Sequence, residues 1–400
     1  MTTAPAESWH TPAGGGGAIA KLLRARRLGW WAARIGIALA RLWNKPLRLG
    51  QRVIVARHDH VQEVLRRDLD FLIAPVNGDR FEAIGFPFIL GKDRAMPLAQ
   101  ERATLYRALS RVEMAPLQAT LEGAITARLG TGAHSIDIVG DYARPLAGST
   151  ARALFGIAPA DEPAFLDAAR AIFAHCFLNL AGDKAVEARA LAAAAQLSAW
   201  FTTEITRRRA AGALGEDLMG QLLRAGADDD LVRRSLGGML VGSIDTTATV
   251  VAKVMAVLIA DRALLARVAA DHADPARMAA WCDEALRRWC HVPLLGRQAA
   301  GATELGGTQI PASAQLILWT QAAMCDPDAF PDPATLRPDR PSGAYLHLGG
   351  GLHPCAGRAI NRWQIAMLVG GLVARGPQRL APIEWAGPFP AHARLSLAGL

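Results

Sequence analysis

The chain has 400 residues, of which 51% are hydrophobic and 20% are charged. This composition predicts a globular protein with a large core and excludes a chain too polar to fold. The formal net charge is +8, but the basic residues are dispersed and are not interleaved with aromatic ones. No nucleic acid is therefore expected as a partner, whereas an acidic docking protein is compatible with the charge.

The N-terminal residues 1–20 lack both the basic start and the apolar stretch of a signal peptide. They predict a disordered tail, followed by one domain over residues 21–400. Residues 28–43 are the best candidate for a membrane span, but they are fewer than the roughly 20 that a span requires, and they include Arg34 and Arg41. No transmembrane span is therefore expected. A surface helix is the simpler interpretation of this stretch, and peripheral contact with a membrane is the alternative.

Apolar residues at three- and four-residue spacing predict helices over most of residues 100–290. Breaks rich in Gly, Asp and Pro are expected at 158–163, 181–184 and 212–217. Three aspartates at 228–230 favour a helix N-terminus, and the longest helix is expected over 231–260. Within it, Gly242 costs about 1 kcal/mol relative to Ala, and the Thr246 hydroxyl can bond back to the Gly242 carbonyl and bend the helix.

Strand patterns are few and short. They fall at residues 52–57 and 314–320, with a hairpin over 301–314 and a loop over 325–351. The expected fold class is therefore mainly α, in a single helix-rich domain with a minor β part. The five cysteines form no CxxC pair, so a disulfide framework and structural zinc are both poorly supported and a reducing cytoplasm fits.

The segment HLGGGLHPCAGRAINR places Cys355 between several glycines and a helical pattern that resumes at residue 359. A helix N-terminus favours the thiolate form of cysteine, which either attacks a substrate or binds a metal. A buried structural cysteine is the simplest alternative. A nucleophile paired with His353 is disfavoured, because side chains two residues apart on a turn seldom face each other. The glycines also fail to match phosphate-binding loops.

Gly351, His353, Cys355 and Gly357 fit the spacing of the haem-binding loop of the cytochrome P-450 superfamily, which the segment resembles. The resemblance implies haem b with Cys355 thiolate as its axial ligand. The position of the usual phenylalanine holds Leu348, which keeps the pocket apolar but is expected to alter the environment of the sulfur.

Two further motifs carry the resemblance. Glu284 and Arg287 share one helix face, and by themselves they indicate no more than a surface pair. The resemblance implies a buried triad with Arg340 that holds the haem loop. In VGSIDTTATVV, Asp245 and Thr246 fall on the acid–alcohol pair that delivers protons during oxygen activation, and Ser243 replaces a glycine of that motif.

The resemblance also implies haem-propionate contacts from Arg107, Arg297 and His353 and covers roughly residues 50–400. It implies a cytoplasmic monooxygenase that inserts one oxygen atom from O2 into an apolar substrate by hydroxylation or epoxidation. Electrons would come from an external ferredoxin and its reductase. The alternatives are a peroxide-driven haem-thiolate oxidase and a non-catalytic haem sensor. Apolar segments at 71–94, 171–180, 240–244 and 292–295 are the expected pocket.

Overall fold

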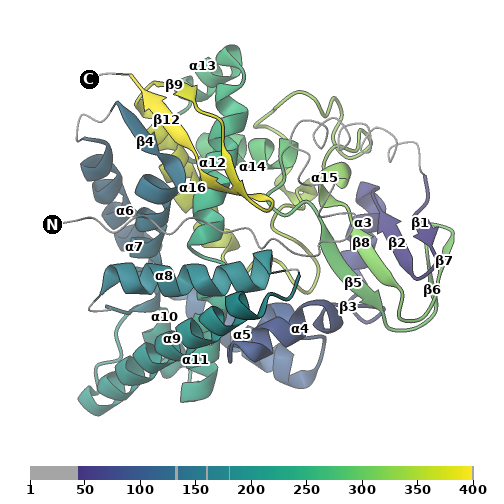
Figure 1. Ribbon diagram of the computed structural model, residues 1–400, viewed down its shortest axis with the longest axis horizontal. Coiled ribbons are helices and arrows are strands. Elements are labelled where there is room, and N and C mark those ends of the chain that lie inside the picture. The colour runs from purple at the N-terminus through teal and green to yellow at the C-terminus, as the bar shows by residue number, and fades with distance from the viewer. Residues whose placement is uncertain (1–43, 131–133, 159–160, 180, 399–400) are drawn as a thin grey trace.

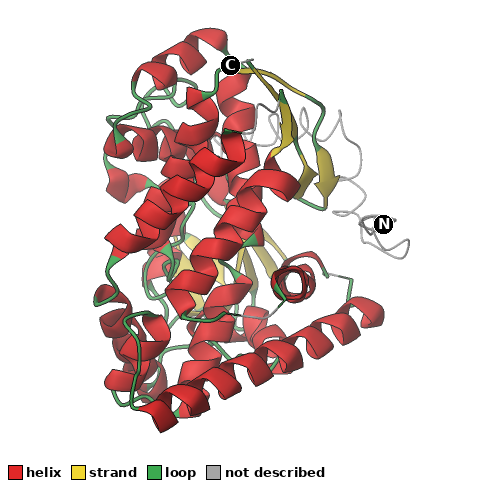
Figure 2. Ribbon diagram, turned by 90° about the vertical axis from the view of Figure 1, so that its left-hand side faces the viewer, coloured by secondary structure: helices red, strands yellow, loops and turns green. Residues whose placement is uncertain are grey.

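A large helical body and a smaller sheet region lie side by side in the molecule (Figure 1). The structure is a computed structural model and describes residues 44–130, 134–158, 161–179 and 181–398. The expected tail over residues 1–20 and the candidate helix over 28–43 lie outside these ranges. The division into a tail and a single domain over 21–400 therefore stays a prediction. Helices make up most of what is described, and the strands form separate groups (Figure 2), as the sequence predicts.

Aspartate caps fix the starts of several helices of the helical body. Its main helices are α5 (Met96–Ser110), α6 (Met114–Leu129), α7 (Arg144–Phe155), α8 (Glu162–Phe173), α9 (Lys184–Ala211), α10 (Leu218–Arg224), α11 (Asp229–Val241), α12 (Asp245–Ile259), α13 (Arg262–Ala270), α14 (Pro275–Arg288) and α16 (Arg358–Ala374). An aspartate side chain accepts a backbone N–H of the first turn in α8, α9, α10, α11, α13 and α14. These caps explain the three breaks expected between residues 158 and 217, which the structure confirms.

The expectation of one uninterrupted helix over 231–260 is wrong. The chain leaves the helix at residues 242–244, between α11 and α12. Before the break, the amides of Gly242 and Ser243 turn back to carbonyls only three residues earlier. After it, the hydroxyl of Thr246 donates to the Gly242 carbonyl and that of Thr247 to the Ser243 carbonyl, the latter at 2.8 Å. Side-chain hydroxyls thus occupy carbonyls at the break, as the glycine and threonines suggest.

The main sheet has five strands in the order β1-β2-β8-β5-β3. Its strands are β1 (Leu47–Leu49), β2 (Arg52–Val55), β3 (Phe71–Leu72), β5 (Leu295–Ala299) and β8 (Gln315–Leu318). β2 and β8 pair in parallel, and the other neighbours pair antiparallel. The strands expected near residues 52–57 and 314–320 are confirmed. So is the hairpin, formed by β6 (Thr303–Leu305) and β7 (Thr308–Ile310), whose Gly306 and Gly307 both have positive φ.

Smaller elements complete the fold. Beside the main sheet lie α3 (His58–Arg66), α4 (Ala74–Ala83) and α15 (Thr320–Ala323), and 3₁₀ turns occur at Ile89–Gly91 and Ser342–Ala344. The sequence did not indicate β4 (Ser135–Asp137), β9 (Pro377–Leu380), β10 (Glu384–Ala386), β11 (Phe389–His392) and β12 (Arg394–Leu397). Two π-helical turns, Ile138–Ala143 and Ala174–Leu178, continue into or out of α7 and α8.

The core lies around α12, which packs against α14 and α16. Within the described ranges, only residues 229–259 are long and apolar enough to cross a membrane, and 67% of the best window there is buried inside the molecule. Such burial is what a core helix pair of a globular protein shows. The expected absence of a membrane span stays a prediction.

Candidate functional site

Cys355 lies just before α16, in a loop that holds its backbone firmly. Its backbone N–H donates to the Leu348 carbonyl at 2.8 Å, and the Asn361 amide lies 3.8 Å from its sulfur. Burial raises the pKa of the Cys355 thiol, although the Gly357 backbone, Arg358 and Asn361 act in the opposite direction. The backbone at the start of α16 acts towards the thiolate, as expected, but burial outweighs it. A thiolate here needs a bound cation, and a metal ion deprotonates a coordinating thiol outright.

The glycines of the loop are not equivalent. Gly351 has φ +62°, and a Cβ there would lie 1.6 Å from the carbonyl oxygen of Leu65 at the end of α3. Only glycine fits this close approach of two backbones. Gly357, in contrast, has room for a side chain, so what it supplies is its backbone N–H beside the sulfur. The loop therefore packs against the end of α3 at Gly351 and leads into the first turn of α16 at Gly357.

A group of basic side chains that form no ion pair in the described chain lies near this loop. Arg297 on β5 and His353 are at least nine-tenths buried, and Arg102 on α5 is close enough to act on His353 electrostatically. No carboxylate in the described chain forms an ion pair with either arginine; the guanidinium of Arg297 donates to its neighbour's carbonyl, that of Gly296, at 2.7 Å. Burial lowers the pKa of Arg297 to about 10. Burial, with Arg297 and Arg102, lowers that of His353 to about 4.

Several polar atoms of this group have no hydrogen-bond partner in the described chain. They are Nη1 of Arg102, the Tyr106 hydroxyl and Nδ1 of His353, all buried. Arg102 and Tyr106 line a cavity of about 330 Å³ that also reaches Leu352, next to His353. Buried polar groups are normally hydrogen-bonded, so this set is complete only with a ligand. Two arginines that form no ion pair in the described chain, beside a cysteine loop, fit haem, which carries two carboxylates.

Arg107 does not join this group. Its side chain is exposed and donates to the carbonyl of Ala103, one turn back on the same helix, at 3.1 Å. Arg102 and Tyr106 are four residues apart and share the inward face of α5, with the guanidinium 5.3 Å from the ring centroid. Arg107, five residues after Arg102, points elsewhere. Arg102 and Tyr106 therefore line the cavity and Arg107 does not; the propionate role expected for Arg107 stays a prediction.

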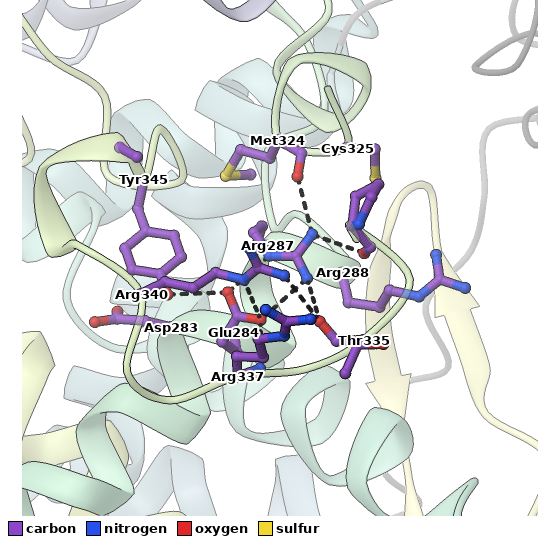
Figure 3. Close-up of polar contacts among 12 residues, drawn as sticks. Asp283, Glu284, Arg287, Arg288, Met324, Cys325, Thr335, Arg337, Arg340 and Tyr345 are labelled. Carbon is purple, nitrogen blue, oxygen red and sulfur yellow. Dashed lines mark hydrogen bonds and ion pairs between the residues drawn. The ribbon is translucent and has the colours of Figure 1, made fainter. Parts of the chain in front are cut away.

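Glu284, Arg287 and Arg340 meet in a buried network beside the loop (Figure 3). Arg287 and Glu284 are both 0% exposed and share two charge-assisted hydrogen bonds of 2.7 and 3.0 Å. Nε of Arg340 lies 3.3 Å from the second oxygen of Glu284. The Tyr345 hydroxyl donates to the same carboxylate at 2.9 Å, as does the backbone N–H of Arg337. The motif is therefore not a surface pair.

The arginines of this network hold the chain that leads to the cysteine. Arg287 donates to the carbonyls of Met324, Pro333 and Thr335 at 3.0 to 3.2 Å, and Arg340 donates to those of Asp332 and Thr335. A buried charge is stable only with such complete pairing. The network consequently fixes the irregular segment before the cysteine loop to α14.

Asp245 starts α12 and is only 4% exposed. Its Oδ1 lies 3.2 Å from Nε of both Arg144 on α7 and Arg170 on α8, while its Oδ2 is buried without a hydrogen-bond partner in the described chain. Thr246 is half-buried at the helix break. The expected acid–alcohol pair thus sits where the helix is interrupted, with one carboxylate oxygen anchored and one available.

A family model described as Cytochrome P450 matches residues 216–375. This range contains the helix break, the charged network and the cysteine loop. Over these residues the chain matches the cytochrome P450 family. Members of the family bind haem b through a cysteine thiolate, so haem b is the cofactor of this chain.

Similar cytochromes P450 come from bacteria. Cytochrome P450 109 of Bacillus spizizenii is 32% identical over 183 residues, 44% of this chain and 44% of that protein. Pentalenic acid synthase of Streptomyces avermitilis is 28% identical over 314 residues, 76% of this chain and 74% of that protein. The match therefore spans less than half the length of the first of these. The solved structure of the open cytochrome P450 Eryk from S. erythraea has a TM-score of 0.79 at 24% identity and covers 94% of this chain and 97% of that one, which shows the shared fold.

Sequence reasoning missed some functional candidates in this chain. Tyr345 gives no motif signal, because its bond to Glu284 joins segments 61 residues apart. Tyr106 could have been found from its four-residue spacing to Arg102 on one helix face. Arg144 and Arg170 come from other helices, so their convergence on Asp245 follows from tertiary structure alone.

Proposed function

We propose that this chain is a cytoplasmic monooxygenase that hydroxylates or epoxidises an apolar substrate with O2, using electrons from a ferredoxin and its reductase. The intact acid–alcohol pair at the helix break carries this proposal, because a peroxide-driven oxidase needs no such proton supply. Haem bound through Cys355 supplies the activation of dioxygen and the oxygen transfer. Cys355 is the ligand assigned here because it alone has the glycine-framed loop at a helix start.

The residues around Asp245 are suited to moving protons. Two guanidiniums hold its Oδ1, and its Oδ2 can accept a proton and pass it on. The Thr246 hydroxyl, bonded to the carbonyl of Gly242, is oriented by the helix break. We assign Asp245 the transfer of protons from outside and Thr246 their delivery to the reacting oxygen. Both roles need the break, which leaves the helix without its regular hydrogen bonds here.

Other residues bind the cofactor and the electron donor. Arg102, Tyr106, Arg297 and His353 would hold the haem carboxylates. Polar atoms of Arg102, Tyr106 and His353 have no hydrogen-bond partner in the described chain, and Arg297 donates only to a backbone carbonyl. Arg358 and Arg362 on the first turn of α16 are exposed, and Arg358 contacts the cysteine loop through the Gly349 carbonyl. They offer a positive surface to an acidic ferredoxin, which raises the association rate and makes it sensitive to salt.

The cysteine assignment is tested with Cys355→Ala and, as a matched control, Cys290→Ala. The reduced parent protein with carbon monoxide should absorb at the Soret position that is specific for a thiolate ligand. Cys355→Ala should lose this band, and Cys290→Ala should keep it. Loss of the band in Cys290→Ala with the fold intact, and its retention in Cys355→Ala, would show that another cysteine is the ligand.

The oxygen reaction is tested with Thr246→Ala and Asp245→Asn and a surrogate ferredoxin system. Thr246→Ala should bind haem and substrate as before but divert electrons to hydrogen peroxide, because protons reach the wrong oxygen. Asp245→Asn should slow turnover by about 10²- to 10⁴-fold and change the solvent isotope effect. If both variants form as much product per reduced nicotinamide as the parent, the monooxygenase proposal is wrong and a peroxide-driven reaction is favoured.

A further inference from the structure

Lys253 is a buried cation that the proposed reaction does not use. It lies on α12 and is 2% exposed. Its ammonium donates to the carbonyls of Cys290 and His291 at 3.4 and 3.2 Å and lies 5.8 and 5.7 Å from the ring centroids of Trp289 and Phe389. No carboxylate in the described chain forms an ion pair with it. Burial lowers the pKa of Lys253 to about 8, which measures how poorly its surroundings compensate the charge.

His291 is a second incomplete group at the same place. It is 6% exposed, and both of its ring nitrogens are buried without a hydrogen-bond partner in the described chain. Its ring packs 4.9 Å from that of Phe389, and its pKa is lowered well below the usual value by burial, then by Lys253 and His347. A neutral imidazole has one N–H to donate and one nitrogen to accept, and both functions are unused here.

Lys253 and His291 adjoin two of the segments that the sequence predicts to line the apolar pocket. Phe389 on β11 contacts Phe173 at the end of α8 and Phe177 in the π-helical turn, with ring centroids 5.3 and 6.4 Å apart. His291 directly precedes the pocket segment 292–295. Phe389 therefore contacts both the aromatic rings of Phe173 and Phe177 and the two polar residues, Lys253 and His291.

Resting on the proposed function, we infer that Lys253 and His291 bind the carboxylate of an apolar acid, so that the substrate is a hydrophobic carboxylic acid. Two of the three ammonium N–H groups of Lys253 are taken by carbonyls, which leaves one for a ligand. A carboxylate can accept that N–H and the ring N–H of His291 at once. A neutral alcohol or a water molecule would satisfy the donors but leave the charge uncompensated, and that charge is the larger cost.

The position of Lys253 on the helix also indicates where the acid is held. Thr246 and Lys253 are seven residues apart, almost two full turns, and so lie on one face of α12 about 10 Å apart along its axis. The carboxylate would therefore be anchored nearly two helix turns along α12 from the residue that we assign to proton delivery. Oxidation is then expected in the middle or far part of the molecule rather than next to the acid group.

The test compares acids with their methyl esters on the haem-loaded protein. The probes are decanoate, hexadecanoate, abietate and lithocholate, each beside its own ester, with the Soret shift and the melting temperature as readouts. At least one acid should bind about 10- to 100-fold more tightly than its ester, the range for a charged hydrogen bond. If no acid exceeds its ester in either readout, the inference is wrong.

Variants decide whether these side chains are responsible. Lys253→Met should remove the preference for the acid while ester binding stays unchanged, and His291→Phe should reduce it several-fold. Lys184→Met removes one exposed charge from α9 and should leave the preference intact. An acid preference that survives Lys253→Met and His291→Phe would overturn the inference. The carbon monoxide band of each variant separates this outcome from a failure of the proposed function, because it reports the thiolate ligand alone.

Discussion

Two buried charges lie close to the second half of α14, and the fold treats them in opposite ways. Glu284 accepts hydrogen bonds from Arg287, Arg340, Tyr345 and a backbone amide, so both of its oxygens are occupied. Lys253 has two carbonyls and two aromatic rings but no acidic partner in the described chain. This difference indicates that Glu284 stabilises the structure, whereas Lys253 binds a ligand, as we propose above.

Removing a partner from the complete network should have the largest effect. Arg287→Ala leaves Glu284 buried with too few partners, which costs about 3–5 kcal/mol of folding free energy. It also frees the carbonyls of Met324, Pro333 and Thr335. We expect little haem incorporation on expression, measured by the ratio of Soret to protein absorbance. Arg288→Ala on the same helix is the control. An Arg287→Ala protein with normal haem content and stability would contradict the structural role of the network.

Removing the charge of Lys253, which has no acidic partner in the described chain, should increase the stability of the fold. The pKa of Lys253 is about 8 in the folded protein against 10.5 as its ordinary value, so the unfolded chain binds more protons between these pH values. The charge therefore destabilises the fold by roughly 3 kcal/mol below pH 8, and this cost disappears as the pH rises towards 10.5.

Lys253→Met should accordingly be more stable than the parent at pH 7, and the gap should narrow above pH 8. Urea unfolding of both proteins at several pH values measures it. The other groups that face Lys253 are Cys290, whose pKa is raised by burial to about 11, and His291, whose pKa is lowered far below neutrality. His291 stays neutral throughout the window from pH 8 to 10.5. Cys290 titrates there in the unfolded chain, near its ordinary pKa of 9.0, but it does so in both proteins, so its contribution largely cancels in the gap between them. A gap that stays constant with pH would show that Lys253 carries no uncompensated charge.

The smallest effect distinguishes two arginines of one helix. Arg102→Gln removes an unpartnered guanidinium from the cavity and should weaken haem retention about tenfold, the value of one charge-assisted contact. Arg107→Gln alters an exposed side chain and should change stability by less than about 0.5 kcal/mol. Transfer of haem to apomyoglobin measures retention in both. Faster loss from Arg107→Gln than from Arg102→Gln would restore the original assignment.

The sequence predicts most of the architecture because its signals are local. Helix periodicity, aspartate caps and the paired glycines at 306 and 307 each act within a few residues, and the structure has the elements they indicate. The same holds for the cysteine loop and for the positions of Glu284, Arg287 and Asp245. Spacing along a helix also places Gly242 and Thr246, but not the extent of the break they cause.

What could not be predicted depends on contacts between distant segments. Arg107 was chosen by its place in a motif, whereas the inward direction of Arg102 and Tyr106 follows from how α5 packs. The pKa of Cys355 was expected to fall because of a helix terminus, but burial by other parts of the chain outweighs it. A lysine within an apolar helix such as Lys253 gives no sign of whether an acid faces it. That question is one of tertiary structure.

The parallel pairing of β2 with β8 determines the order in which this protein can assemble. Arg52 pairs with Gln315 and Val55 with Leu318. Strand β2 is synthesised early, and it can form this pairing only after β8 has been synthesised. During synthesis the edge of β2 stays open until most of the polypeptide has left the ribosome. Pairings of such high sequence separation fold slowly and expose strand edges to aggregation. Slow expression at low temperature should therefore raise the yield of intact protein more than any surface substitution.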